Sequence, residues 1–180
     1  MHKSIGLFYG SSTCYTEMAA EKIRDAIDGN MQQPVVDVHN VADNSVHLIS
    51  NYQYLILGIP TWDYGELQED WETNWQSLDN LDLKGAKVAI FGLGDQIGYP
   101  QWFQDAMGYL WAKVVNQGAS PIGYWPNKGY DFEKSKALTE DEKSFVGLAL
   151  DDENQFDLTD QYIDQWCLQV LREFGHLDSE

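Results

Sequence analysis

Short apolar runs separated by longer segments give the chain its first recognisable pattern. The runs cover residues 5–9, 35–38, 54–58, 88–92 and 121–124, and a further run at 145–150 continues the last of them. The first four are almost continuously apolar rather than alternating, which is typical of strands buried on both faces of a parallel sheet. The pattern therefore predicts an α/β protein built on a central parallel sheet.

Segments between these runs carry apolar residues at helical spacing, which predicts amphipathic helices. We expect the first helix to end at Gly29-Asn30, because Gly and Asn commonly stand just past a helix C-terminus. Alternation of strand and helix implies right-handed crossovers, and hence a three-layer, doubly wound sheet. The helical stripes are Ala19, Ile23 and Ile27; Phe103, Ala106, Met107, Leu110, Val114 and Val115; and Ile163, Trp166, Cys167, Val170, Leu171 and Phe174.

A length of 180 residues predicts a single domain spanning residues 1–180. Residues 125–142 are polar, interrupted by Gly and Pro, and poorly periodic, so we interpret them as an insertion within the last strand region. The chain shows neither an internal repeat nor a flexible linker.

The charge balance narrows the function classes. The chain has 11 Lys and Arg but 29 Asp and Glu, which gives a net charge of −18. This charge repels nucleic acid and anionic lipid, and it suits a partner protein with a basic docking face. The two cysteines cannot build a disulfide framework, and no zinc-like Cys/His spacing occurs. The N-terminal residues are too polar for a signal peptide and no apolar run approaches membrane-spanning length, so we expect a soluble cytoplasmic protein.

Ligands of open parallel sheets bind beyond the carboxyl ends of the strands, which directs attention to three loops. The loop at residues 10–17 reads Gly-Ser-Ser-Thr-Cys-Tyr-Thr-Glu and opens a helix. Its hydroxyls and the free N–H groups of a helix start favour an anion. Without Lys or Arg, and without the Gly-Lys-Ser/Thr of a P-loop, it suits a monophosphate rather than a nucleoside triphosphate. The alternative is a Ser/Thr-rich helix cap with no ligand.

The other two loops, residues 58–66 and 92–100, each offer one aromatic residue among small and turn-forming ones. Trp62 and Tyr99 on adjacent loops would sandwich a flat heterocycle whose polar edge is read by backbone amides. The alternative is that these aromatics pack on each other. The glycines of the second loop have the wrong spacing for a dinucleotide fingerprint. Three such loops at adjoining strand ends are together a specific signal.

On these residues the sequence resembles the flavodoxins, in particular the long-chain bacterial type called flavodoxin 2 or flavodoxin B. The resemblance covers essentially the whole chain. The insertion at 125–142 matches the one that separates long-chain from short-chain members. The most specific stretches are residues 6–20, 57–71, 92–98 and 145–155.

The resemblance implies a five-stranded sheet of order 2-1-3-4-5 and a low-potential one-electron carrier with non-covalent FMN. It places Trp62 and Tyr99 on the two faces of the isoalloxazine ring, and Asp95 near its pyrimidine side. The Asp63-Tyr64 peptide faces flavin N5, and Asp151 lies near the ribityl chain. The implied phosphate residues are Ser11, Ser12, Thr13, Tyr15 and Thr16. The other residues expected at the cofactor are Cys14 of the same loop and, from the ring loops, Pro60, Thr61, Gly65, Leu93 and Gly94.

Cys14 and the acidic segments of the candidate site raise further expectations. Many flavodoxins have Gly where Cys14 stands, so this turn must use ordinary dihedral angles or carry strain. A thiol at a helix start is also a candidate reactive cysteine.

Acidic residues fill the candidate contact segments at 63–72 and 151–153, where they would disfavour negative charge on reduced flavin or simply form a solvated surface.

The sequence shows no Ser/His/Asp or Cys/His arrangement, so we expect an electron-transfer protein rather than an enzyme, acting as a monomer. The resemblance implies a flavodoxin/ferredoxin–NADP reductase-like donor and low-potential acceptor enzymes, docking on the acidic face. Two alternatives stay open. One is an FMN-dependent NAD(P)H:quinone-type reductase, and the other is a flavin-free interaction domain on the same topology, as in phospho-receivers.

Overall fold

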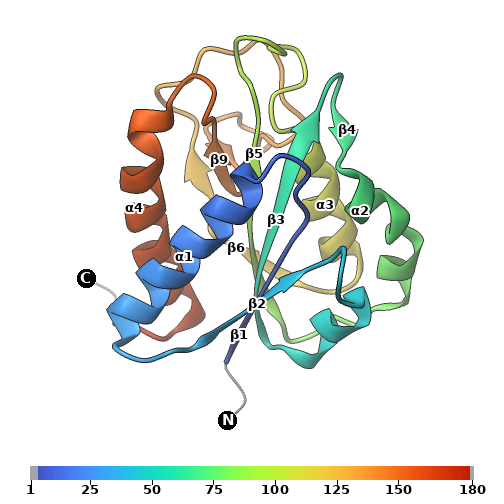
Figure 1. Cartoon of the computed structure of the whole chain (residues 1–180), viewed down its shortest axis with the longest axis vertical. Helices are drawn as coiled ribbons and strands as arrows, with labels where there is room; N and C mark the ends of the chain where they lie inside the picture. The colour runs from blue at the N-terminus through green and yellow to red at the C-terminus, as the bar shows by residue number, and fades with distance from the viewer. Residues whose placement is uncertain (1–3, 179–180) are drawn as a thin grey trace.

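A parallel sheet forms the centre of the molecule in the computed structural model, which describes residues 4–178 (Figure 1). Its strands follow the order β2-β1-β3-β5-β6, and β9 also pairs with β5. This order confirms the predicted doubly wound sheet. The strands are β1 (Ile5–Tyr9), β2 (Val36–Asn40), β3 (Tyr54–Trp62), β5 (Lys87–Leu93), β6 (Ser120–Ile122) and β9 (Leu148–Leu150), and β4 (Glu66–Leu67) pairs antiparallel with the end of β3.

The last strand of the sheet is interrupted, as predicted. β6 pairs with the first half of β5, at Lys87 to Ala89, and β9 pairs with its second half, at Phe91 to Leu93. Between them the chain leaves the sheet and forms a small antiparallel ladder of β7 (Trp125–Pro126) and β8 (Ser144–Phe145).

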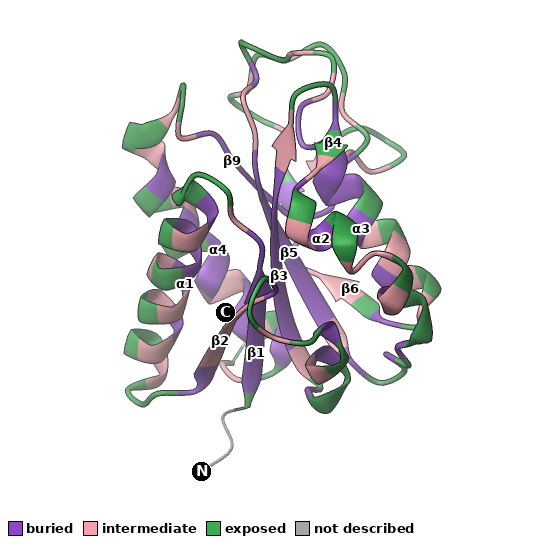
Figure 2. Cartoon of the chain, turned by 45° about the vertical axis from the view of Figure 1, so that its right-hand side comes forward, coloured by how far each residue is buried: buried purple, intermediate pink, exposed green. Residues whose placement is uncertain are grey.

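Helices cover both faces of the sheet (Figure 1). α1 (Tyr15–Met31) and α4 (Phe156–Phe174) lie together on one face, while α2 (Glu69–Thr73) and α3 (Asp105–Asn116) lie on the other. Figure 2 shows buried residues concentrated on the strands and on the helix faces turned toward them. The connection from β2 to β3 holds only the 3₁₀ helix η1 (Val46–Asn51), and η2 (Gln76–Asn80) precedes β5.

The end predicted for the first helix is wrong. α1 continues through Gly29 and Asn30 to Met31, and Gln32, with φ of 55°, is the C-cap. The extra residues let Met31 pack against the core. The carboxylate of Asp28 then accepts the backbone N–H groups of Val35 and Val36, which sets the entry into β2. These contacts outweigh the roughly 1 kcal/mol cost of a helical glycine.

Candidate functional site

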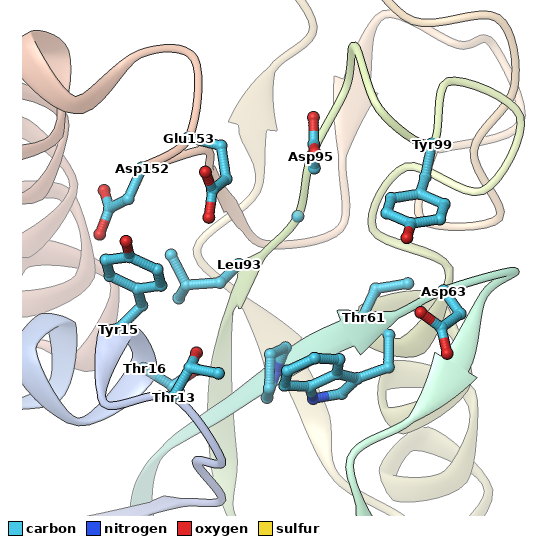
Figure 3. A pocket seen from close by; sticks show the side chains of 13 residues that line it. Thr13, Tyr15, Thr16, Thr61, Asp63, Leu93, Asp95, Tyr99, Asp152 and Glu153 are labelled. Carbon is cyan, nitrogen blue, oxygen red and sulfur yellow. The ribbon is translucent and has the colours of Figure 1, made fainter.

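The three predicted loops meet in one cleft at the carboxyl ends of β1, β3 and β5, with a cavity volume of about 160 Å³. Figure 3 shows Thr13, Tyr15 and Thr16 at one end of this cleft and Tyr99 and Asp63 at the other. The lining residues are Thr13, Tyr15, Thr16, Pro60, Thr61, Trp62, Asp63, Leu93, Gly94, Asp95, Tyr99, Asp152 and Glu153.

Hydrogen-bond donors at the α1 end of the cleft lack protein partners. No side chain caps the start of α1, so its first-turn N–H groups have no side-chain acceptor. The buried Ser11 Oγ makes no hydrogen bond to any group in the part of the chain that the structure describes. A helix start with an unpaired hydroxyl beside it fits a small anion.

The loop after β1 is held against α2 by Gln68, which is fully buried. Its Oε1 accepts the N–H groups of Asp70 and Trp71, and its Nε2 donates to Ser12 Oγ at 3.2 Å. A Cβ on Gly10 would clash with Gln68 Oε1, so the glycine allows this close approach. Gln68 therefore links the loop after β1 to the start of α2.

The opposite end of the cleft is aromatic. Trp62 lies at the end of β3 and is half-buried, and its buried Nε1 has no hydrogen-bond partner among the described residues. Tyr99 is 37% exposed. Tyr64 is 66% exposed, and its ring centroid lies 4.9 Å from that of Trp102 and 6.2 Å from that of Tyr99. Tyr64 therefore supports Tyr99 from outside the cleft.

The turn from β3 to β4 is built on two residues with positive φ, Asp63 at 43° and Gly65 at 86°. Thr61 Oγ1 accepts the N–H of Ala106 and so ties this turn to the first turn of α3. Asp105 lies beneath the turn, where burial raises the pKa of its carboxyl. Its Oδ1 accepts the N–H of Lys136 from the insertion.

The side chains of the acidic segment after β9, residues 151–153, have two different surroundings. Asp152 and Glu153 line the cleft, and burial raises the pKa of Asp152. Asp151, which the resemblance placed near a cofactor, is 1% exposed and its carboxylate contacts Gln96 and Asn154 instead. The sequence signal for Asp152 and Glu153 was the acidic run itself, but it did not show which acid faces the cleft.

The remaining predicted residues lie beside the cleft rather than in its lining. The side chains of Ser12 and Asp151 bond to protein, and those of Cys14 and Tyr64 are exposed. The Ser11 hydroxyl is buried without a partner among the described residues. Cys14 is an exposed, free thiol at the N-cap of α1. The predicted residues outside the lining are Ser11, Ser12, Cys14, Tyr64, Gly65 and Asp151.

No group of three or more His, Cys, Asp or Glu in residues 4–178 is arranged to hold a metal ion. None of the helices described has the length and apolar character needed to cross a membrane.

Comparison with known proteins gives a consistent result. Residues 7–166 match the family model described as Flavodoxin. The chain is 55% identical over 172 residues to Flavodoxin 2 of Escherichia coli K12, covering 96% of this chain and 97% of that one. It is 51% identical over 175 residues to a flavodoxin of Nostoc sp. PCC 7120, covering 97% and 99%. A solved structure of Fusobacterium nucleatum flavodoxin bound to flavin mononucleotide superposes with a TM-score of 0.87 at 32% identity, covering 95% of this chain and 98% of that one.

Proposed function

The chain belongs to the flavodoxin family, and from that premise we propose that it carries electrons one at a time on a non-covalently bound FMN. The observation that carries the proposal is the cleft itself, which has unpaired donors at one end and aromatic residues at the other. This polarity matches a molecule with a phosphate at one end and a flat ring at the other.

Neutral donors would hold the phosphate. Thr13 and Thr16 line the cleft at the start of α1, where no side chain among the described residues caps the helix, and the unpaired Ser11 hydroxyl belongs to the same loop. A helix N-terminus attracts negative charge, so a dianion does not need a Lys or Arg here. Ser12 is engaged by Gln68 and would act by shaping the loop.

The ring would lie between Trp62 and Tyr99, with the backbone of Leu93 and Gly94 along its edge. Bound FMN supplies reversible one-electron chemistry, and the protein supplies orientation and electrostatics. Asp63 lies at the same end of the cleft as Tyr99, and Asp152 and Glu153 line the cleft on the Tyr15 side (Figure 3). Carboxylates along the cleft disfavour added negative charge on the ring and lower the reduction potential. Tyr99 would cover the face that a second planar substrate needs, which argues against a quinone reductase.

The proposal extends to the redox partners, the location and the oligomeric state of the protein. A net charge of −18 supports docking on basic partners, namely an NADP(H)-dependent reductase as donor and low-potential enzymes as acceptors. Two free cysteines and the charge support a cytoplasmic, monomeric protein that forms one domain over residues 1–180.

Anaerobic reductive titration of the FMN-loaded protein tests the function. A carrier gives tight FMN uptake and two resolved one-electron steps with a low second potential. A single two-electron step, with NAD(P)H oxidation in the absence of any reductase, would instead identify a hydride-accepting enzyme. Failure to bind FMN would leave the flavin-free interaction domain.

A further inference from the structure

A buried carboxylate joins the loops on two sides of the cleft. Oδ2 of Asp151 accepts the backbone N–H of Gln96 at 3.0 Å and its side-chain Nε2 at 2.8 Å. The N–H of Asn154 donates to Oδ1 at 3.1 Å, and Asn154 Nδ2 lies within 3.1 Å of both oxygens. Asp151 is 1% exposed and Gln96 is 2% exposed, so the bonds between these two residues are shielded from water.

The same network reaches two further points. Asn154 Nδ2 also donates to Asp95 Oδ1 at 2.8 Å, and that oxygen closes the turn by accepting the N–H groups of Ile97 and Gly98. Gln96 Oε1 accepts the backbone N–H of Asp131 from the insertion. The loop carrying Tyr99, the segment after β9 and the insertion are thereby joined through one pair of buried side chains.

We propose that Asp151 is a positioning residue that fixes the Tyr99 loop, at the ring end of the cleft, relative to the 152–153 segment, which lines the cleft on the Tyr15 side; the inference rests on the proposed function. It does this through Gln96 and Asn154 rather than by touching a flavin. Every partner of its carboxylate is a donor, so an amide in its place would set an NH₂ group against another N–H on one side. Loss of charge-assisted bonds in a buried network is costly.

The positioning role and a purely electrostatic role predict opposite results for Asp151→Asn. Removing an acid near a phosphate dianion would strengthen FMN binding and leave riboflavin, which lacks the phosphate, unchanged. Loosening the ring end would weaken both ligands by the same factor, about tenfold to a hundredfold. We therefore expect dissociation constants from flavin fluorescence titration of the apoprotein to rise together for FMN and riboflavin.

Matched variants sharpen this experiment. Ser11→Ala at the phosphate end should weaken FMN binding while leaving riboflavin affinity unchanged. Asp157→Asn changes the net charge equally from an exposed position on α4 and should alter neither affinity. Tyr99 stacking adds a spectroscopic readout, because a displaced loop leaves the fluorescence of bound riboflavin less quenched.

Gln96→Leu removes the other half of the pair and keeps the test informative if Asp151→Asn folds poorly. In a double-mutant cycle the two changes should be strongly non-additive, since each breaks the same network. Amide hydrogen exchange of the apoprotein should show lost protection at Gln96, Asn154 and Asp131 in both variants. Unchanged riboflavin affinity in both variants, or additive effects on FMN, would overturn the proposal.

Discussion

At the scale of single residues, the cleft is bordered by unusual backbone conformations. Cys14 has φ of 69° and Asp63 has φ of 43°, a region that side-chain-bearing residues rarely occupy. Of the two outcomes expected for Cys14, ordinary dihedral angles or strain, the structure shows the second. The start of α1 and the β3–β4 turn therefore adopt conformations that glycine would occupy more easily.

Cys14→Gly should stabilise the apoprotein by about 1 kcal/mol. The left-handed conformation costs a residue with a Cβ about 1–2 kcal/mol, which glycine avoids. The greater freedom of glycine in the unfolded chain offsets roughly 0.4–1 kcal/mol of this gain. Urea denaturation measures the difference. Cys14→Ala retains a Cβ and serves as the control, so equal stabilisation by Ala and Gly would show that strain is not the cause.

Asp63→Gly should widen the interval between the two one-electron potentials of the FMN-loaded protein. Glycine frees the 63–64 peptide to take either orientation toward the flavin, so the first reduction step becomes easier relative to the second. We expect a change of tens of millivolts, because tenfold in a one-electron equilibrium is about 59 mV. Asp63→Ala removes the carboxylate but keeps the Cβ, and an equal shift in that variant would assign the effect to charge.

At the scale of elements, apolar runs predicted the central strands well because a parallel sheet buries both faces of each strand. Helix ends were harder to predict. Gly29 carries a local stop signal, yet the packing of Met31 against the core and the bonds of Asp28 extend α1 beyond it. Such contacts depend on how the residues after the helix fold back on it, which the apolar spacing of the helix does not show.

The site was predictable at the level of loops rather than of individual side chains. The three loops and the aromatic pair were predicted from residue types at strand ends, and all three line the cleft. Which acid of the 151–153 run faces inward depends on Gln96, a residue 55 positions away from Asp151. The sequence alone carries no information about that pairing.

The first turn of α3 gives a pH-dependent prediction. Burial raises the pKa of Asp105, so its ionised form destabilises the fold at neutral pH. Asp105→Asn retains an oxygen for the Lys136 N–H and avoids this penalty. We expect the variant apoprotein to be more stable than the wild type at pH 7.

The advantage of the Asp105→Asn variant should shrink as the pH falls through the raised pKa of the folded carboxyl. It should be absent below about 3.9, the ordinary value of an unfolded Asp, because Asp105 is then neutral in both states. Thermal unfolding of the two apoproteins across this range provides the measurement. A stability difference that does not vary with pH would show that burial of the charge is not its source.

At the scale of the whole molecule, the excess of acids has two consequences that salt should separate. A net charge of −18 makes the folded chain repel itself, and it also attracts basic partners over long distances. Screening weakens both effects, since the Debye length falls from about 30 Å at 0.01 M salt to about 3 Å at 1 M. Salt should therefore improve stability and impair association at the same time.

Raising NaCl over this range should move the urea midpoint of the apoprotein upward and slow electron transfer from an NADP(H)-dependent reductase by at least about tenfold. The described salt bridges, such as Lys22–Asp160 and Lys113–Asp79, involve at least one well-exposed side chain, so their screening costs little stability. A higher urea midpoint together with slower electron transfer is informative, because a general effect of salt on protein solvation would not produce both changes. A reductase rate that is unaffected by salt, alongside a rising midpoint, would mean that the partner does not recognise the negative field and docks through apolar contacts instead.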